Sequence, residues 1–108
     1  MPITPPMMGA LDAAVSGIRS GTTRLDAAAH TIANVNSTDD EGQPVEGRRV
    51  TLRETDRGVA ATEQGTGAPA ELVGPMVDSM VARHEIAANA SLIRTAHETY
   101  GEIVNLGR

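Results

Sequence analysis

The histidines and their acidic neighbours are the residues best suited to metal chemistry. His84 precedes Glu85, as in zinc peptidases that bind the metal through two histidines four residues apart on a helix. The position four residues after His84 is Ala88, so the second ligand is missing. His97 follows thirteen residues later, about 220° around a helix, and does not face His84. We therefore expect solvated histidines on helix surfaces and no metal site.

Three other kinds of segment lack the residues that their chemistry needs. Residues 65–67 (Gly-Thr-Gly) lack the third glycine of a dinucleotide site, and no Gly-Lys pair follows for a phosphate loop. The acidic run 39–41 lacks the spaced ligands and the distal Glu of a calcium loop. Neither Ser16, Ser20 nor Ser79 stands between the glycines of a nucleophile elbow. We expect a linker, a solvated turn, no cofactor, no small-molecule substrate and no enzymatic activity.

The composition predicts a weak core. The chain has 108 residues, one aromatic residue (Tyr100) and no cysteine, which excludes disulfides and thiolate metal sites. Much of its 40% hydrophobic content is Ala, which buries little apolar area. The net charge of -5 disfavours nucleic-acid binding, and no apolar run is long enough for a membrane span. We expect an isolated monomer to be marginal and to be completed by partners.

Four segments follow from the pattern of the chain. Residues 1–7 are predicted to form an irregular arm, or alternatively to place Pro5 and Pro6 in a first helical turn capped by Thr4. The arm has no basic region or apolar core of a secretory signal, so we expect any export to use another route. Residues 8–36 are predicted as a helix.

The predicted first helix carries a heptad stripe of mostly apolar residues, which is typical of a coiled-coil seam. Its members are Leu11, Val15, Ile18, Thr22, Leu25, Ala29 and Ile32. Small residues, Gly17 and Gly21 among them, permit another helix to approach closely. Each of these two glycines lowers the stability of an isolated helix by about 1 kcal/mol relative to Ala, so neighbours must hold the helix.

The linker 37–69 is predicted to be irregular, with a possible β-hairpin over 48–63. Apolar and polar residues alternate through 48–54, and Asp56-Arg57-Gly58 favours a turn. Residues 64–70 contain Gly65, Gly67 and Pro69 and are predicted as a second break. Two interpretations of Arg48, Arg49 and Arg53 stay open: they meet acidic groups on a partner, or they form a charged edge that discourages strand aggregation.

The last segment, 70–108, is predicted as a second helix. Pro75 stands near its start, where proline is tolerated, and Gly107 near its end. Its broad stripe consists of Leu72, Met76, Met80, Ala87, Ala90, Ile93, Ala96, Tyr100 and Ile103. The predicted fold is therefore mainly α, with two long terminal helices pairing as an antiparallel coiled-coil hairpin around the linker.

The two ends together resemble the bacterial flagellar rod, hook and hook-associated axial proteins. The first helix contains Ser16-Gly17-Ile18 and closes on Ile32-Ala33-Asn34-Val35-Asn36-Ser37, similar to the family's N-terminal motif. Residues 76–80, 87–96 and 103–106 resemble its C-terminal helix, and residues 42–50 are similar to a segment of the proximal rod proteins. The resemblance covers about residues 10–52 and 70–106. The chain lacks much of the middle segment usual in the proximal rod proteins.

The resemblance implies a structural subunit of the flagellar basal-body rod in the periplasm. Such subunits are exported by the flagellar type III apparatus and polymerise with copies of themselves and with other rod subunits. It further implies that one set of helix positions pairs with another and that Asn34 and Asn36 end the first helix. The first set is Leu11, Val15, Ile18, Leu25 and Ile32, and the second is Met76, Met80, Ile93, Tyr100 and Ile103.

Two other classes of helical protein remain as alternatives. One is a small secreted helical hairpin of another export system, such as type VII secretion, whose members usually carry a Trp-x-Gly turn or a tyrosine-acid tail that this chain lacks. The other is a helical adaptor protein.

Overall fold

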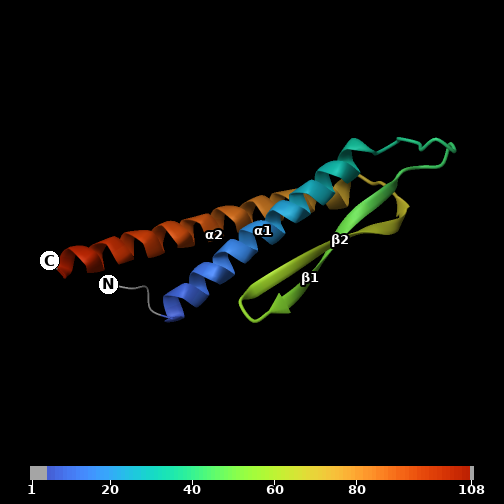
Figure 1. Ribbon diagram of the computed structural model, residues 1–108. Coiled ribbons are helices and arrows are strands. Elements are labelled where there is room, and N and C mark those ends of the chain that lie inside the picture. Colours follow the sequence, from blue (N-terminus) through green and yellow to red (C-terminus); the bar gives the residue numbers. More distant parts are fainter. Residues whose placement is uncertain (1–4, 108) are drawn as a thin grey trace.

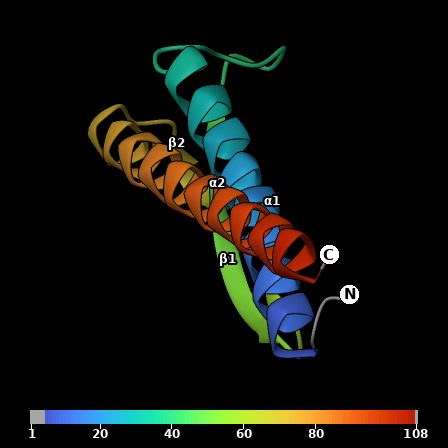
Figure 2. The same ribbon diagram turned by 90° about the vertical axis from the view of Figure 1, so that its left-hand side faces the viewer.

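The computed structural model describes residues 5–107 and consists of two long helices with a β-hairpin between them. Helix α1 spans Pro5–Ala33 and helix α2 spans Val73–Leu106. Strands β1 (Glu46–Thr55) and β2 (Gly58–Pro69) pair in antiparallel fashion. The helices run in opposite directions (Figure 1) and cross at an angle (Figure 2) in a molecule 68 Å long. This arrangement confirms the predicted fold class.

Helix α1 starts three residues earlier than the predicted boundary at residue 8. Pro5 and Pro6 form its first turn, where the missing N–H group of proline would have no helical partner in any case. Residues 5–7 of the predicted arm are therefore helical, and the rest of the arm, with the cap expected at Thr4, lies outside the described residues.

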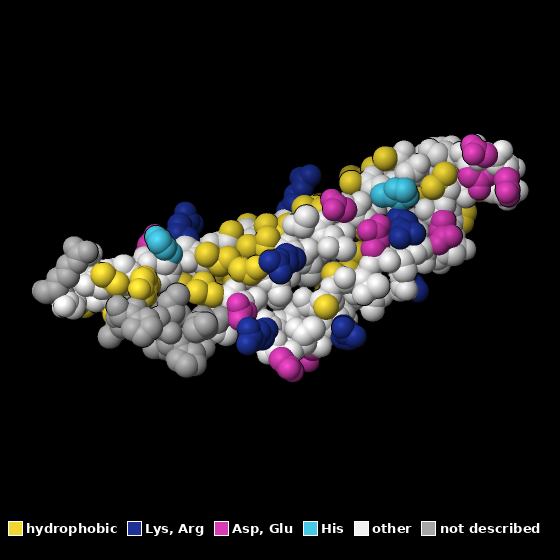
Figure 3. Space-filling model, in the orientation of Figure 1, with side chains coloured by type: hydrophobic (Ala, Val, Ile, Leu, Met, Phe, Trp, Pro, Cys, Tyr) yellow, Lys and Arg dark blue, Asp and Glu magenta, His cyan; other side chains and the backbone are white. Residues whose placement is uncertain are grey.

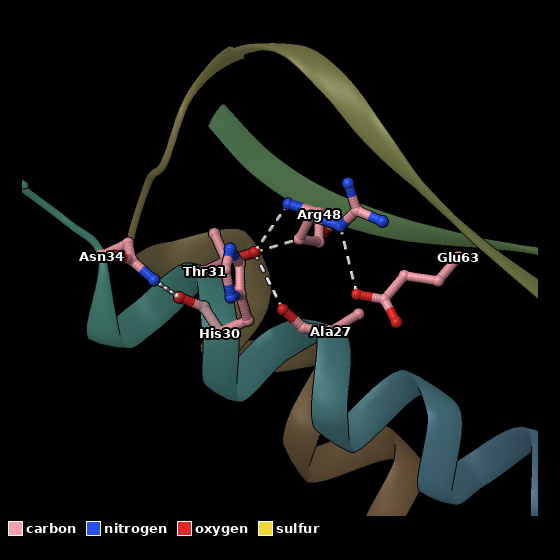
Figure 4. Close-up of polar contacts among 6 residues, drawn as sticks. All are labelled: Ala27, His30, Thr31, Asn34, Arg48 and Glu63. Atoms are coloured by element: carbon pink, nitrogen blue, oxygen red, sulfur yellow. Dashed lines mark hydrogen bonds and ion pairs between the residues drawn. The ribbon is translucent and has the colours of Figure 1, made fainter. Parts of the chain in front are cut away.

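Helix α1 ends at Ala33, before the two asparagines that were expected to end it. The backbone N–H of Asn34 donates to the carbonyl oxygen of His30 at 3.1 Å, and its side-chain Nδ2 donates to the same oxygen at 2.8 Å (Figure 4). Asn36 has φ 68°, a left-handed conformation that Asn adopts more readily than most residues and that turns the chain out of the helix.

Helix α2 occupies all but the ends of the predicted segment 70–108. Its first hydrogen bond runs from the N–H of Met76 to the carbonyl oxygen of Leu72, so Pro75 falls in the first turn, where it displaces no helical bond. At the other end the N–H of Gly107 donates to the carbonyl oxygen of Ile103 at 3.1 Å.

The β-hairpin is longer than the predicted 48–63. Thr55 pairs with Gly58, so Asp56 and Arg57 form the two-residue turn at the predicted place. The predicted break over 64–70 is wrong, because β2 continues to Pro69. The register of the ladder shifts between the pairs Glu46–Pro69 and Arg48–Gly65. One residue lies between these pairs on β1 and three lie between them on β2, which makes a bulge. Gly67 supplies the positive φ of 74° that the bulge requires.

Helix α1 is the central element. It packs against α2 and against both strands, whereas α2 meets β1 near its first turns, where Pro75 and Asp78 line a hollow together with β1 residues. Two hydroxyls of α1 bond the hairpin backbone: Thr31 Oγ1 accepts from the N–H of Arg48 at 2.8 Å (Figure 4), and Ser16 Oγ accepts from the N–H of Val59 at 3.0 Å. Thr31 is buried, and its hydroxyl also donates to the carbonyl oxygen of Ala27 at 2.9 Å.

Replacing Thr31 by Val should detach this end of the hairpin from α1. The shape is nearly conserved, but the N–H of Arg48 loses its acceptor, so we expect Thr31→Val to lower the free energy of unfolding by about 1–3 kcal/mol in urea titrations. Thr22→Val is the matched control, because the Thr22 hydroxyl is exposed and bonds only to the carbonyl of Ile18 in its own helix. Equal effects of the two substitutions would contradict the role of Thr31.

Candidate assembly surface

The contact between α1 and α2 is made by small side chains and glycines. A Cβ atom on Gly17 would lie 2.5 Å from Nδ2 of Asn89, and one on Gly21 would lie 2.6 Å from Cγ1 of Ile86. Both distances are too short for real carbon atoms, so the absence of a side chain at these two positions is what lets the helices approach.

These glycines belong to a heptad seam that lies beside the predicted one. The seam residues of α1 recur at steps of three and four, and each stands one position before a residue of the predicted stripe, about 100° around the helix. They are Ala14, Gly17, Gly21, Arg24 and Ala28. Facing them on α2 are Ala82, which is fully buried, Ile86 and Asn89. The α1 side of the seam thus consists largely of Gly and Ala, and the larger residues in it are Arg24 on α1 and Ile86 and Asn89 on α2.

Three of the residues predicted to pair the helices lie on the surface instead. Val15 is 39% exposed, Met76 48% and Met80 68%, which corrects their predicted place in the seam. Large side chains would hold the two helix axes apart, and the glycines allow a closer packing that turns the large side chains outward. In the orientation of Figure 1, Figure 3 shows apolar side chains gathered along the middle of the molecule.

The other predicted pairing residues are half-buried. On α1 they line the flank of the seam, on the side away from the residues that bond the hairpin, and are Leu11, Ile18, Leu25 and Ile32. On α2 they continue the face that carries Ala82 and Ile86 toward the C-terminus, and are Ile93, Tyr100 and Ile103.

An ion pair that the sequence did not reveal lies within the seam. Arg24 Nη1 and Glu85 Oε2 are 2.8 Å apart, with the arginine side chain 18% exposed. The sequence placed Arg24 off the stripe, and its partner is 61 residues away, so no local pattern joins them. Polar groups at seam positions favour one alignment of paired helices over others, and Arg24–Glu85 favours the observed antiparallel one.

The largest group of exposed apolar side chains among the described residues lies at the start of α2, on its outer face and beside it. They fall within residues 72–81 and are Leu72, Val73, Met76, Val77, Met80 and Val81. Val73, Val77 and Met80 recur at steps of four and three, on the side of α2 opposite Ala82 and Ile86. Each helix therefore has one apolar stripe that the partner helix covers incompletely or not at all, which is typical of a surface that other proteins cover.

Two kinds of feature, metal-ion clusters and membrane-spanning helices, are not found among the described residues. Within 5–107 no three His, Cys, Asp or Glu side chains lie close enough together to hold a metal ion. Neither helix, over the same range, is apolar enough along its length to span a bilayer. Comparison of the chain with protein-family models and with curated proteins gives no match.

Adding a methyl group at Gly21 should force the helices apart. We expect Gly21→Ala to lower the free energy of unfolding by about 1–3 kcal/mol, because Ile86 must move and overpacking outweighs the gain in helix propensity. Gly9→Ala is the control: among the described atoms none lies within 4 Å of its Cβ position, so this change should raise stability by up to about 1 kcal/mol. Stabilisation by both substitutions in denaturant titrations would contradict the close seam.

Proposed function

We propose that this chain is a structural subunit of the bacterial flagellar basal-body rod. In this proposal it is exported by the flagellar type III apparatus and polymerises in the periplasm with copies of itself and with other rod subunits. Its role is assembly, with no catalytic step and no cofactor.

The observation that carries the proposal is the inverted distribution of side chains along the helix pair. Glycines and alanines lie at the contact between α1 and α2 beside Arg24, Ile86 and Asn89. Half-buried large side chains flank the seam, and exposed ones lie on the outer face of α2. Covering the exposed Val and Met side chains in an assembly would bury apolar surface that folding of the chain leaves in contact with water. The flank of α1 and the outer face of α2 are different surfaces. When the flank of one copy contacts the outer face of the next, each end of the row still has one free surface, so further copies can add.

The motif residues occupy structural positions that agree with this role. Gly17 of the Ser-Gly-Ile motif lies at the closest approach of the two helices, and Ser16 bonds the hairpin. Asn34 and Asn36, from the second motif, lie in the turn that directs the chain away from α1. The motifs that support the family resemblance thus coincide with the points that define the fold of this chain.

A negative charge on the outer face of α2 should block assembly without unfolding the chain. Met80 is 68% exposed, so we expect Met80→Asp to keep the helical circular dichroism of the wild type while self-association in sedimentation velocity and swimming in soft agar are lost. Thr62→Asp adds the same charge on the exposed hairpin and should change neither readout.

Two outcomes would contradict the rod assignment. One is normal swimming of bacteria that carry only the Met80→Asp form. The other is absence of the wild-type chain from purified flagellar basal bodies, which would favour a secreted helical hairpin of another export system or an adaptor protein.

A further inference from the structure

A hollow lined by arginines lies at the junction of α1, β1 and the start of α2. Its volume is about 240 Å³, and its lining includes Arg24, Arg48, Arg49 and one carboxylate, Asp78, together with the apolar Ala28 and Leu52. The nine basic residues of the chain are all arginines, so a third of them meet in this one hollow of an acidic protein.

Two of the three arginines are held in place, and the third has no partner. Arg24 pairs with Glu85, and Arg48 Nε lies 3.2 Å from Glu63 Oε1 while its backbone N–H is bonded by Thr31. Among residues 5–107, no carboxylate lies within ion-pair distance of Arg49, which sits on β1 at the edge of the hollow. The hollow therefore offers the free guanidinium of Arg49 beside Arg24 and Arg48, whose own positions are fixed by their ion pairs.

The loop between α1 and β1 carries the complementary charge. It is closed by a β-bridge between Thr38 and Pro44, and Asp39 Oδ1 accepts from the N–H groups of Glu41 and Gln43, both at 2.9 Å. Asp39 thereby stabilises the loop, and the carboxylates of Asp40 and Glu41 are exposed, with no ion-pair partner among the described residues. This loop forms one end of the molecule (Figure 1), where Figure 3 shows acidic side chains gathered.

We propose that the arginine-lined hollow binds Asp40 and Glu41 of a second copy of this chain. The loop of the same chain is held at the end of the molecule by its bridge, so its carboxylates are presented outward to a neighbour. Guanidinium groups bind carboxylates through paired, charge-assisted hydrogen bonds, and a fixed loop loses little conformational entropy on docking. The inference rests on the proposed assembly and adds the polar contact that sets the alignment of neighbouring copies.

Charge reversal tests this contact. In sedimentation velocity, R49E and E41R should each weaken self-association about tenfold or more, because like charges then face each other across the contact. The double variant R49E/E41R restores opposite charges and should recover most of the affinity. The control is R53E, the same change on the same strand at a residue that does not line the hollow, and it should have little effect. Higher salt should weaken the wild-type contact.

Cross-linking gives a second readout that keeps the charges intact. The chain has no cysteine of its own, so a mixture of Q43C and L52C copies, with the first change in the loop and the second in the hollow, should form a disulfide-linked dimer of one copy of each. A Q43C and T62C mixture, with the second thiol on the exposed hairpin outside the hollow, should not.

The outcomes separate this inference from the proposed function. Equal effects of R49E and R53E, failure of the double variant to recover affinity, or equal cross-linking at both thiol positions would overturn the contact. If M80D abolishes self-association while R49E leaves it unchanged, the helix-mediated assembly stands and this contact is rejected. Failure of the wild-type chain to self-associate, together with no cross-link, would overturn both.

Discussion

The structure depends on how closely α2 can approach α1. Helix α1 has to contact a second helix on one face and a hairpin on another, and both contacts are made at residues with little or no side chain beyond Cβ. Gly17 and Gly21 admit Asn89 and Ile86 from one side, while Ser16 and Thr31 offer their hydroxyls to the hairpin on the other. Larger residues on either face would separate α1 from one of its partners.

This constraint has an energetic consequence for the monomer. The fully buried hydrophobic side chains of the described residues are all Ala, at positions 14, 27, 28 and 82. Burial of a methyl group removes far less apolar surface from water than burial of Leu or Val, so the half-buried Leu and Ile side chains beside the seam supply much of the hydrophobic contribution. An ion pair and a few hydroxyl contacts add alignment more than stability. Covering the outer apolar residues in an assembly would supply the missing burial.

Much of this fold could be predicted from the sequence, because its signals are local. The hydrophobic periodicity of the terminal segments predicts two helices, Pro75 and the asparagines near residue 35 mark helix ends, and Asp56-Arg57-Gly58 marks the hairpin turn. The predicted seam lies one residue away from the observed one, because the periodicity of large apolar side chains does not mark the buried face in this chain. In this chain Val15 is exposed and Ala14, beside it, is buried. Large apolar side chains are usually the buried ones, but small side chains are buried instead where two helix backbones pack closely.

Contacts between distant segments could not be predicted. Arg24 and Glu85 are far apart in the sequence, and each taken alone fits a solvated helix surface. The glycines of β2 look like a break because glycine lowers strand propensity, and only the pairing with β1 shows that they form a bulge instead.

The attachment of the hairpin mainly to α1 makes its far part exchangeable. Since, within the described residues, α2 meets the hairpin only near its first turns, the part of the hairpin around its turn can grow, shrink or be replaced with little change in how the ends of the chain meet. The tight turn at Asp56 and Arg57 is the natural point for an insertion, because it lies at the exposed tip farthest along the ladder from the bulge. In the proposed assembly, a common helical frame with interchangeable inserts would let subunits differ in outline and still join the same filament.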